Sequence, residues 1–478
     1  MISDNNIESF IKRNQNKSII VIQGLGFVGS VMALVCANSK KDYYAVIGID
    51  LPTEHGKKII NNINNGIFPL TAEDPKIEEF YQNSYKRGNF IASYDEYGYS
   101  CADIIIVDVN LDVEKNNYTS GTLNDYNVDL TSFKSAITAI GLNCKPDALI
   151  IVETTVPPGT CQEVVKPIII ECLKQRKLST DNIKIGHSYE RVMPGPDYID
   201  SIQSFFRVYS GIDKKSADAV ETFLHTIIQT DKYPLTRLGN TNATEMAKVL
   251  ENSYRAMNIA FMVEWSRFAE ESGVDLYEVV DAIRMRPTHA NLMYPGIGVG
   301  GYCLPKDALL ASWARQNITG NNEPLVQSET AIIINDQMPR FAFEFMKKYY
   351  PDLEDSKILL LGISYRSDVG DTRFSPVGKL YDYLTEAGSN ITCHDPYVKF
   401  WEEQSLDINQ NLISHLSSSK DIIIISTGHT LYKNKKTINA LRDLDSTFIY
   451  DTIGLLSADQ INILKQKHTV KVLGRGDL

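Results

Sequence analysis

SIIVIQGLGFVG, residues 18–29, decides the fold of the first part of the chain. Residues 18–23 form a short apolar run typical of a buried strand, and three glycines follow it at once. Gly24 allows a tight turn, Gly26 allows a pyrophosphate to approach the backbone, and Gly29 lets the next helix pack on the strand. The helix N-terminus then faces the phosphates with its partial positive charge. This pattern predicts a dinucleotide site in a parallel α/β sheet.

A second apolar run, residues 44–50, supports this interpretation because it ends in an acidic residue. Asp50 lies 21 residues after Gly29, at the end of the predicted second strand. Its carboxylate can accept hydrogen bonds from both ribose hydroxyls and would repel a 2′-phosphate, which favours NAD over NADP. A glycine turn without a ligand and an FAD site of the same fold remain alternatives. The expected cofactor contacts are Gly24, Gly26, Phe27, Val28, Gly29 and Asp50.

Strands and helices alternate along much of the chain. Residues 102–109 and 147–153 are two further candidates for buried strands, and residues 129–142 supply a crossover helix between them. Such alternation predicts a parallel sheet with right-handed crossovers, in a first domain that ends near residue 210. The pattern returns later, with predicted strands at 357–362, 390–395, 421–427, 447–451 and 469–474 and a helix at 376–387.

One long segment differs from both regions. In residues 242–272 apolar side chains recur at helical spacing, no proline interrupts them, and Gly273 can end the helix. We expect a long central helix that contributes to the core and to a dimer interface. The predicted fold class is therefore α/β, with two Rossmann-like doubly wound domains joined by a long central helix region.

The bulk composition excludes several classes of function. The formal net charge is −11, so a broad basic surface for nucleic acid is not expected. The first 17 residues are polar and no long apolar run follows, which predicts no signal peptide, no membrane span and a cytoplasmic location. The seven cysteines are scattered singly, so we expect neither a metal site nor a disulfide scaffold.

The segment GIGVGGYCLPKD, residues 296–307, indicates covalent chemistry. Four glycines hold a single cysteine, Cys303, in a loop, and Pro305 suits the first turn of a helix through residues 308–315. A thiol before a helix N-terminus, with Lys306 nearby, favours the thiolate, which is the nucleophilic form. Most lone cysteines are small buried apolar residues, and we interpret the other six in that way.

These motifs together resemble those of the UDP-glucose/GDP-mannose dehydrogenase family. The cysteine segment is similar to the family's catalytic motif GGSCxPKD, and five other stretches match in the family's order, from about residue 18 to residue 475. They are residues 24–29 (similar to GxGYVG), 153–160 (STVPxGT), 189–195 (PERxxPG), 245–252 (AExxKxxxN), and 371–376 with 395–397 (DxRxSP and DPY).

The resemblance implies three domains and an assembly. They are an N-terminal NAD-binding Rossmann domain at residues 1–210, a central helical dimerisation domain with the cysteine loop at 211–325, and a C-terminal Rossmann-like UDP-sugar-binding domain at 326–478. A homodimer or a higher homo-oligomer is expected, because the family's central helix forms its dimer.

The resemblance also implies the reaction. In this family the cysteine adds to an aldehyde made by a first hydride transfer, a second hydride transfer gives a thioester, and water hydrolyses it. Each substrate consumes two NAD⁺, and the uronic acid product supplies surface polysaccharide synthesis. Lys248 and Asn252 are four residues apart and match the pair that stabilises the oxyanion, although alone they would be ordinary surface polar groups. The implied catalytic residues are Cys303, Lys248 and Asn252, with Asp307 for proton transfer and water activation, and Thr155 and Glu190 for positioning water or acid/base work.

The same motifs imply further ligand contacts, and Thr155 and Arg373 join the cofactor contacts. Departures from the family's pattern remove no catalytic group but can reshape the pocket; they are Tyr302 for serine or histidine, Tyr189 for proline, Arg366 for lysine and Phe374 for glutamate. The implied substrate contacts are Glu190, Arg191, Lys248, Asn252, Gly300, Lys306 and Arg366.

Residues 189–195 bear on the identity of the sugar. Family members that act on UDP-glucose commonly carry PEFLREG here, whereas those acting on UDP-N-acetylhexosamines commonly carry PERxxPG, which this segment resembles. A UDP-N-acetylhexosamine is therefore favoured over UDP-glucose, with GDP-mannose a further alternative. Two other classes remain. One is a two-electron 3-hydroxyacid-type dehydrogenase, which needs no nucleophilic cysteine and no third α/β domain, and the other is a non-enzymatic nucleotide-sugar sensor.

Overall fold

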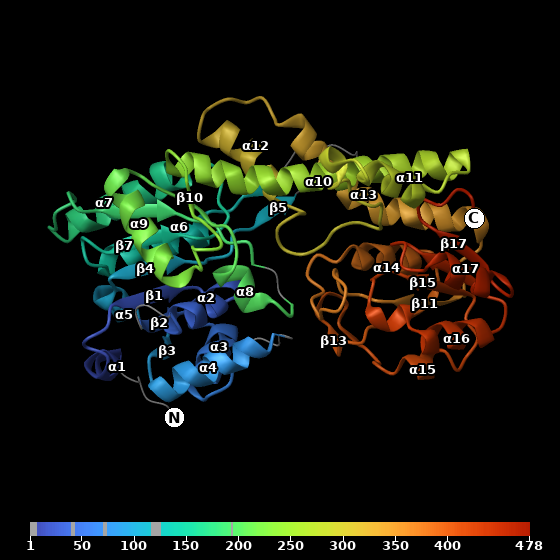
Figure 1. Cartoon of the computed structure of the whole chain (residues 1–478), viewed down its shortest axis with the longest axis horizontal. Helices are drawn as coiled ribbons and strands as arrows, with labels where there is room; N and C mark the ends of the chain where they lie inside the picture. Colours follow the sequence, from blue (N-terminus) through green and yellow to red (C-terminus); the bar gives the residue numbers. More distant parts are fainter. Residues whose placement is uncertain (1–6, 40–43, 70–73, 116–125, 193–194) are drawn as a thin grey trace. The chain divides into compact units, whose positions relative to one another are not determined.

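The computed structural model describes residues 7–39, 44–69, 74–115, 126–192 and 195–478. These residues form two compact units, the first within residues 1–116, 125–250 and 313–323 and the second within residues 251–312 and 324–478 (Figure 1). Two helices, α10 (Thr241–Ser272) and α12 (Asp307–Asn317), contribute residues to both units. The division into three domains at residues 210 and 325 stays a prediction.

The first unit contains a doubly wound sheet with strand order β10-β9-β8-β7-β4-β1-β2-β3. The six strands from β8 to β3 in that order are parallel, as the sequence predicted. All five residues of β1 are buried between parallel neighbours, which explains its unbroken apolar run. The strands are β1 (Ile19–Gln23), β2 (Ala45–Ile49), β3 (Phe90–Ser93), β4 (Ile104–Val107), β7 (Leu149–Val152), β8 (Lys184–His187), β9 (Val208–Gly211) and β10 (Thr236–Arg237), and a separate ribbon pairs β5 (Val113–Lys115) with β6 (Tyr126–Val128).

The expectation of a wholly parallel sheet is wrong at one edge. β9 pairs antiparallel to β8 through Gly186 and Gly211, and β10 then lies parallel to β9. Among its described residues, the connection from β8 to β9 has the six-residue α8 (Tyr198–Gln203) as its one helix, so the chain returns in the opposite direction instead of making a full crossover. Mixed sheets with an antiparallel edge are common among doubly wound proteins.

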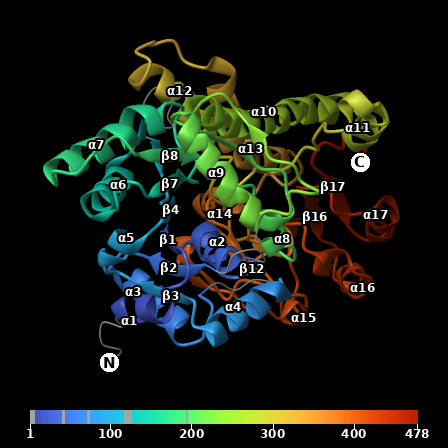
Figure 2. The same ribbon diagram turned by 60° about the vertical axis from the view of Figure 1, so that its left-hand side comes forward.

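Helices cover this sheet in two groups. α2 packs on β1 and β2 and against α4 and α8, whereas α6 packs against α5 and α7. Both views of the molecule show α6 and α7 side by side (Figures 1 and 2). The helices are α1 (Ile7–Arg13), α2 (Phe27–Ala37), α3 (Glu54–Asn64), α4 (Pro75–Arg87), α5 (Tyr97–Cys101), α6 (Thr131–Asn143), the π-helical turn η1 (Cys161–Val165), α7 (Lys166–Gln175), α8 and α9 (Lys214–Ile227).

The predicted long helix is confirmed as α10, which has 32 residues and is followed by Gly273 in the left-handed region, at φ +70°. Several of its large apolar side chains are exposed. In the second unit they are Tyr254, Phe261, Trp265 and Phe268.

The second unit contains a five-stranded parallel sheet with strand order β12-β11-β15-β16-β17. This is the other common doubly wound order, and every strand predicted after residue 357 is present. Its elements are α11 (Leu276–Arg284), η2 (Pro287–His289), α13 (Val326–Tyr349), β11 (Lys357–Leu361), α14 (Pro376–Glu386), β12 (Asn390–His394), β13 (Phe400–Trp401), η3 (Glu402–Gln404), β14 (Leu406–Asp407), α15 (Leu412–His415), β15 (Ile422–Ile425), η4 (Thr430–Lys433), α16 (Lys435–Asp443), β16 (Phe448–Asp451), α17 (Ala458–Lys465) and β17 (Thr469–Val472).

Two details of the second unit differ from the sequence expectations. The helix α13 was not predicted, and it accommodates Pro339 in its interior. The helix expected at residues 308–315 begins at Asp307 as α12, with Pro305 in the turn before it. Over the part of the chain described here, no helix has both the length and the hydrophobicity needed to cross a membrane.

Candidate active site

The predicted dinucleotide loop joins β1 to α2, and its three glycines have different surroundings. A Cβ atom on Gly24, whose φ is +95°, would lie 2.4 Å from the carbonyl oxygen of Asp108. A Cβ atom on Gly29 would lie 1.9 Å from the carbonyl oxygen of Gly24. At Gly26, by contrast, a Cβ atom would meet nothing within 4 Å, and no side chain caps the N-terminus of α2 there. Two glycines are therefore needed by the fold, and the third leaves open space where a pyrophosphate can reach the helix N-terminus.

Asp50 is held beside this loop. Its Oδ2 accepts a hydrogen bond from the backbone N–H of Leu25 at 2.8 Å, and its Oδ1 accepts one from Leu51 at 2.7 Å. Phe27 and Val28 are half-buried at the start of α2. The carboxylate thus lies at the end of β2 next to the glycine loop, as a ribose ligand requires.

Thr155 lies in the loop that follows β7 and is half-buried. Its neighbour Thr154 fixes the start of the loop, because its Oγ1 donates to the carbonyl oxygens of Val107 at 3.1 Å and Val109 at 3.0 Å. The end of the loop is fixed at Gly159, whose N–H donates to Glu245 at 2.6 Å. The loop is therefore anchored on both sides of Thr155.

Glu190 and Lys248 lie together in the first unit. The Lys248 Nζ donates to the carbonyl oxygen of Glu190 at 2.9 Å and lies 4.0 Å from its Oε1. The ring of Tyr189 lies beneath two cations, with Lys248 Nζ and the Arg191 guanidinium carbon each 5.4 Å from its centroid. Tyr189, which stands where the family has proline, therefore stabilises the positive charges of Lys248 and Arg191 by cation–π contacts. Met193 and Pro194, in the same predicted motif, lie outside the described residues.

Arg191 makes one further contact. Its guanidinium donates to the carbonyl oxygen of Phe206 at 2.8 Å, which holds the side chain beside the loop before β9.

The cysteine loop in the second unit surrounds a buried carboxylate. Asp307 is fully buried, and its Oδ2 accepts a hydrogen bond from Asn252 Nδ2 at 2.7 Å. Its Oδ1 accepts one from Lys306 Nζ at 3.2 Å. The carbonyl oxygen of Cys303 accepts from the N–H groups of Lys306 at 3.1 Å and Asp307 at 2.9 Å, so the half-buried cysteine stands in the turn that leads into α12. The structure thus brings together four residues that the sequence assigned to one site.

The glycines before Cys303 allow the loop to lie against residues 365–374. A Cβ atom on Gly300 would lie 2.5 Å from the carbonyl oxygen of Phe374, and the N–H of Gly301 donates to the carbonyl oxygen of Arg373 at 3.0 Å. The ring centroid of Tyr302 lies 4.3 Å from Lys306 Nζ, which is a cation–π distance. Tyrosine at this position therefore helps to place the lysine.

Arg373 binds the carboxylate of Asp371 through two parallel hydrogen bonds, of 2.9 Å from Nε and 2.7 Å from a terminal nitrogen. This fork holds the guanidinium at the surface of the second unit.

Arg366 lines a cavity of about 510 Å³ at the carboxyl ends of β11, β15 and β16. Nucleotides bind at this edge of doubly wound sheets. Lys433, which the sequence analysis did not single out, lines the same cavity. No motif marks this lysine, because it lies outside the short motifs on which the sequence analysis relied.

A buried carboxylate, that of Asp395, holds Ser364, which lines that cavity. Asp395 Oδ2 accepts hydrogen bonds from the N–H groups of Ile363 at 3.0 Å and Ser364 at 3.1 Å and from His429 Nε2 at 3.0 Å. Burial works against its ionisation, yet these hydrogen bonds hold the pKa of Asp395 below its ordinary value. His429, like Lys433, lies outside the matched motifs.

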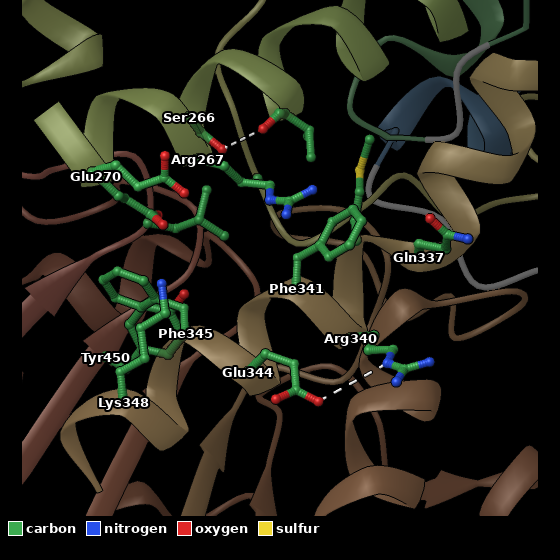
Figure 3. Close-up of a pocket in the computed structure, with 15 residues that line it drawn as sticks. Ser266, Arg267, Glu270, Gln337, Arg340, Phe341, Glu344, Phe345, Lys348 and Tyr450 are labelled. Carbon is green, nitrogen blue, oxygen red and sulfur yellow. Dashed lines mark hydrogen bonds and ion pairs between the residues drawn. The ribbon is translucent and has the colours of Figure 1, made fainter. Parts of the chain in front are cut away.

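A second cavity, of about 410 Å³, lies between α10 and α13 (Figure 3). The Arg267 guanidinium carbon lies 4.3 Å from the ring centroid of Phe341, and burial raises the pKa of Glu270 to about 7. None of the predicted site residues lines this cavity.

Comparisons with known proteins agree with this geometry. The sequence matches the UDP-glucose/GDP-mannose dehydrogenase family in its NAD-binding domain at residues 18–228, its central domain at 242–336 and its UDP-binding domain at 359–458. The UDP-N-acetyl-D-mannosamine dehydrogenase of Methanocaldococcus jannaschii is 31% identical over 476 residues, 98% of each chain. The enzyme of that name from Pyrococcus horikoshii is 26% identical over 96% of this chain and 100% of its own.

A solved structure shows the same fold. The UDP-D-ManNAc dehydrogenase structure from Pyrococcus horikoshii has a TM-score of 0.79 at 25% identity, covering 96% of this chain and 100% of that one. The predicted fold class is thereby confirmed, and the glycine loop with Asp50 fits NAD as the cofactor. The chain belongs to the UDP-glucose/GDP-mannose dehydrogenase family and is an NAD-dependent nucleotide-sugar dehydrogenase.

Proposed function

We propose that this enzyme oxidises the C6 hydroxyl of a UDP-N-acetylhexosamine to a carboxylate in two steps, with Cys303 as the covalent nucleophile. The observation that carries the proposal is the Asp307 carboxylate, held by Asn252 and Lys306 within one helical turn of Cys303. A buried carboxylate beside a thiol in a glycine loop suits covalent catalysis followed by hydrolysis.

Each residue has a distinct task in this scheme. NAD⁺, when bound, supplies the hydride acceptor for each oxidation. The Cys303 sulfur adds to the C6 aldehyde, and the Asn252 amide and the Lys248 ammonium stabilise the oxyanion that forms. After the second oxidation, Asp307 takes a proton from the water that cleaves the thioester.

The remaining predicted residues position water, exchange protons or bind the substrate. Thr155 and Glu190 position water or exchange protons near C6, while Arg191 and Arg366 bind the sugar nucleotide as cations. This chemistry retains the aldehyde on the enzyme, so the uronic acid is the only sugar product released.

The identity of the sugar rests on two supports. Residues 190–192 keep the Glu-Arg pattern of the N-acetylhexosamine type. The relatives from Methanocaldococcus jannaschii and Pyrococcus horikoshii carry names that specify UDP-N-acetyl-D-mannosamine. We therefore place this sugar first among the N-acetylhexosamines, and we assign the product to surface polysaccharide synthesis.

The test is an assay of the purified enzyme with a panel of sugar nucleotides: the UDP-activated N-acetyl derivatives of mannosamine, glucosamine and galactosamine, UDP-glucose and GDP-mannose. We expect the highest kcat/KM with a UDP-N-acetylhexosamine and two NADH for each sugar consumed. One NADH per sugar with release of a free aldehyde would exclude the covalent scheme. Preference for UDP-glucose would leave that scheme intact and correct only the substrate.

A further inference from the structure

Three of the predicted reactive residues in the first unit come from three different elements. Thr155 follows β7, Glu190 follows β8, and Lys248 lies on α10. Their relative positions therefore depend on whatever joins these elements. Two buried charged side chains, Glu245 and Arg207, make the joining contacts.

Glu245 joins the Thr155 loop to α10. Its side chain is fully buried, and its two carboxylate oxygens accept hydrogen bonds from the N–H groups of Gly159 at 2.6 Å and Cys161 at 2.8 Å. It lies three residues before Lys248, so both side chains leave neighbouring positions of the same helix. The carboxylate thus fastens the loop to the turn of α10 that carries the lysine.

The loop has little freedom to compensate for loss of this contact. Gly159 has a φ of +103°, which other residues rarely adopt, and a Cβ atom there would lie 2.7 Å from the Ile318 side chain. Displacement of Gly159 would therefore move the whole segment back to Thr155.

Arg207 joins the ends of β7 and β8. Its Nε donates to Ser188 Oγ at 3.1 Å, and a terminal nitrogen donates to the Ser188 carbonyl oxygen at 3.1 Å. The same terminal nitrogen forms an ion pair with the buried carboxylate of Glu153. Glu153 lies two residues before Thr155, and Ser188 lies two residues before Glu190. One guanidinium therefore sets the two loops side by side.

Stability alone is a weak reason for these buried charges. Removing a carboxylate and a guanidinium from water costs several kcal/mol for each ion, and apolar residues often replace such groups without loss of stability. Burial lowers the pKa of Arg207 to about 10, so the guanidinium remains charged at neutral pH. Its hydrogen-bond and ion-pair partners Ser188 and Glu153 belong to the two segments that lead to Glu190 and Thr155.

We propose that Glu245 and Arg207 are positioning residues for the oxidation, which set Thr155, Glu190 and Lys248 relative to one another without touching the substrate. This inference rests on the proposed function, because it assumes that these three residues surround the reacting carbon. It assigns a role to two side chains that the reaction itself does not use.

The test compares full-length variants of the enzyme at a pH well above the Glu245 pKa of about 7, which burial raises. Glu245→Gln keeps the shape of the side chain but turns an NH₂ group towards a backbone N–H. Arg207→Lys keeps the charge but replaces the planar fork, whose separate nitrogens reach Ser188 and Glu153, with a single ammonium nitrogen. We expect kcat to fall about 100-fold in each, since small misplacements of reacting groups have effects of this order. The KM for the sugar nucleotide and the Kd for NAD⁺ should change less than about threefold.

A milder variant and a matched control separate positioning from general stability. Ser188→Ala removes one acceptor of Arg207, together with the hydrogen bond that Ser188 Oγ donates to the Val208 carbonyl oxygen at 3.1 Å, and should lower kcat about fivefold. Asp74→Asn is the control, because Asp74 is a buried carboxylate whose oxygens likewise accept from two backbone N–H groups, those of Lys76 and Ile199. Asp74 does not hold a segment that carries a predicted reactive residue. The Asp74→Asn variant should therefore lose thermal stability while its kcat stays near that of the wild type.

Three results would overturn the inference. If Glu245→Gln and Ser188→Ala keep the wild-type kcat, these contacts do not position the reacting groups. If Asp74→Asn loses kcat as much as Glu245→Gln at the same loss of thermal stability, the effect is one of folding only. A wild type inactive on every sugar nucleotide would overturn the proposed function and this inference together, whereas an active wild type with unchanged variants overturns the inference alone.

Discussion

Cys303, the proposed nucleophile, differs from most of the other cysteines in its exposure. It is half-buried, whereas Cys36, Cys144, Cys161, Cys172 and Cys393 are all buried, and burial raises the pKa of each of these five thiols. A raised pKa keeps a thiol protonated and unreactive at neutral pH. Of the other cysteines, only Cys101 shares the intermediate exposure of Cys303.

Replacement of the Cys303 sulfur tests the covalent scheme directly. In Cys303→Ser the hydroxyl has a far higher pKa than a thiol, so little nucleophile exists at neutral pH. We expect steady-state turnover to fall by several orders of magnitude, while calorimetry shows binding of NAD⁺ and the sugar nucleotide nearly unchanged. Mass spectrometry should detect a trapped ester on the peptide that contains residue 303, or the reaction should stop at the aldehyde.

Cys101→Ser is the matched control and should retain full activity. Turnover of Cys303→Ser near the wild-type rate would contradict the scheme, because the second oxidation would then need another group, such as a hydrated aldehyde activated by Asp307.

The raised pKa of Glu270, which lines the cavity between α10 and α13, predicts that the stability of the protein depends on pH. Burial raises its pKa from 4.5 to about 7, although the N–H of Gly474 donates to its carboxylate at 2.8 Å. Between these two values the folded protein holds a proton that the unfolded chain has lost. Stability therefore falls as pH rises from about 4.5 to about 7, and the loss is complete above that window.

Glu270→Gln removes this titration. Relative to the wild type, the variant should gain at most about 3 kcal/mol of unfolding free energy between pH 4.5 and pH 8, measured by urea denaturation. Comparison with the wild type cancels other groups, such as Glu245 and Asp451, whose pKa values burial also raises. A difference that does not change with pH would show that Glu270 is ionised throughout.

At the scale of elements, the glycines between β1 and α2 are of two kinds. Gly29 is needed by the fold, whereas Gly26 is expected to serve cofactor binding. Gly29→Ala places a methyl group on the carbonyl oxygen of Gly24, which is backbone and cannot yield, so this variant should fold poorly. Gly26→Ala has open space around its methyl group and should keep the wild-type melting temperature. Its NAD⁺ affinity should nevertheless fall at least tenfold, because the methyl group occupies the approach of the pyrophosphate.

Calorimetric titration with NAD⁺ and a thermal melt check both statements. Undiminished NAD⁺ binding by Gly26→Ala would show that the cofactor does not approach this turn.

The same elements show which parts of the fold a sequence can predict. Buried parallel strands are continuous apolar runs, so β1, β11 and β15 were recognised directly. The edge strand β10 has only two residues, and the direction of its neighbour β9, which is antiparallel to β8, depends on a connection whose path no local pattern records. The helix α13 was missed because Pro339 normally indicates a helix boundary, yet here it is buried inside the helix.

The candidate site was predictable to the extent that it consists of motifs. Cys303, Lys306 and Asp307 are consecutive or nearly so, and Lys248 and Asn252 have helical spacing, so both groups are visible in the sequence. Arg207 is a single arginine between apolar residues, and nothing in its neighbours indicates a buried cation that joins two loops. Such contacts depend on strand order and burial, which only the folded chain provides.

For the whole molecule, we expect the anionic substrate to be bound by a few local positive charges and not by the overall charge of the protein. The formal net charge is −11, although the proposed substrate is itself an anion. The proposed cationic contacts to it are single side chains at defined places: Lys306 in the cysteine loop, and Arg366 and Lys433 in the cavity of the second unit. Binding of the sugar nucleotide should therefore depend on these few groups, and not on long-range attraction by the surface.

The exposed apolar side chains of α10 predict that the molecule is a homodimer or a higher homo-oligomer. Phe261, Trp265 and Phe268 are 53%, 44% and 59% exposed, and consecutive ring centroids lie 6.0 Å apart. A row of aromatic rings on one helix face would be costly to leave in water, since monomeric proteins seldom expose contiguous apolar patches of this kind. A second copy of the same helix can cover the row by twofold symmetry. The double substitution Phe261→Asp and Phe268→Asp places charges in such an interface, so light scattering at micromolar concentration should show a monomer where the wild type shows at least a dimer. Lys436→Asp, an exposed charge change on α16, is the control and should leave the assembly intact. A monomeric wild type, or a double variant that remains a dimer, would show that this face of α10 does not hold the subunits together.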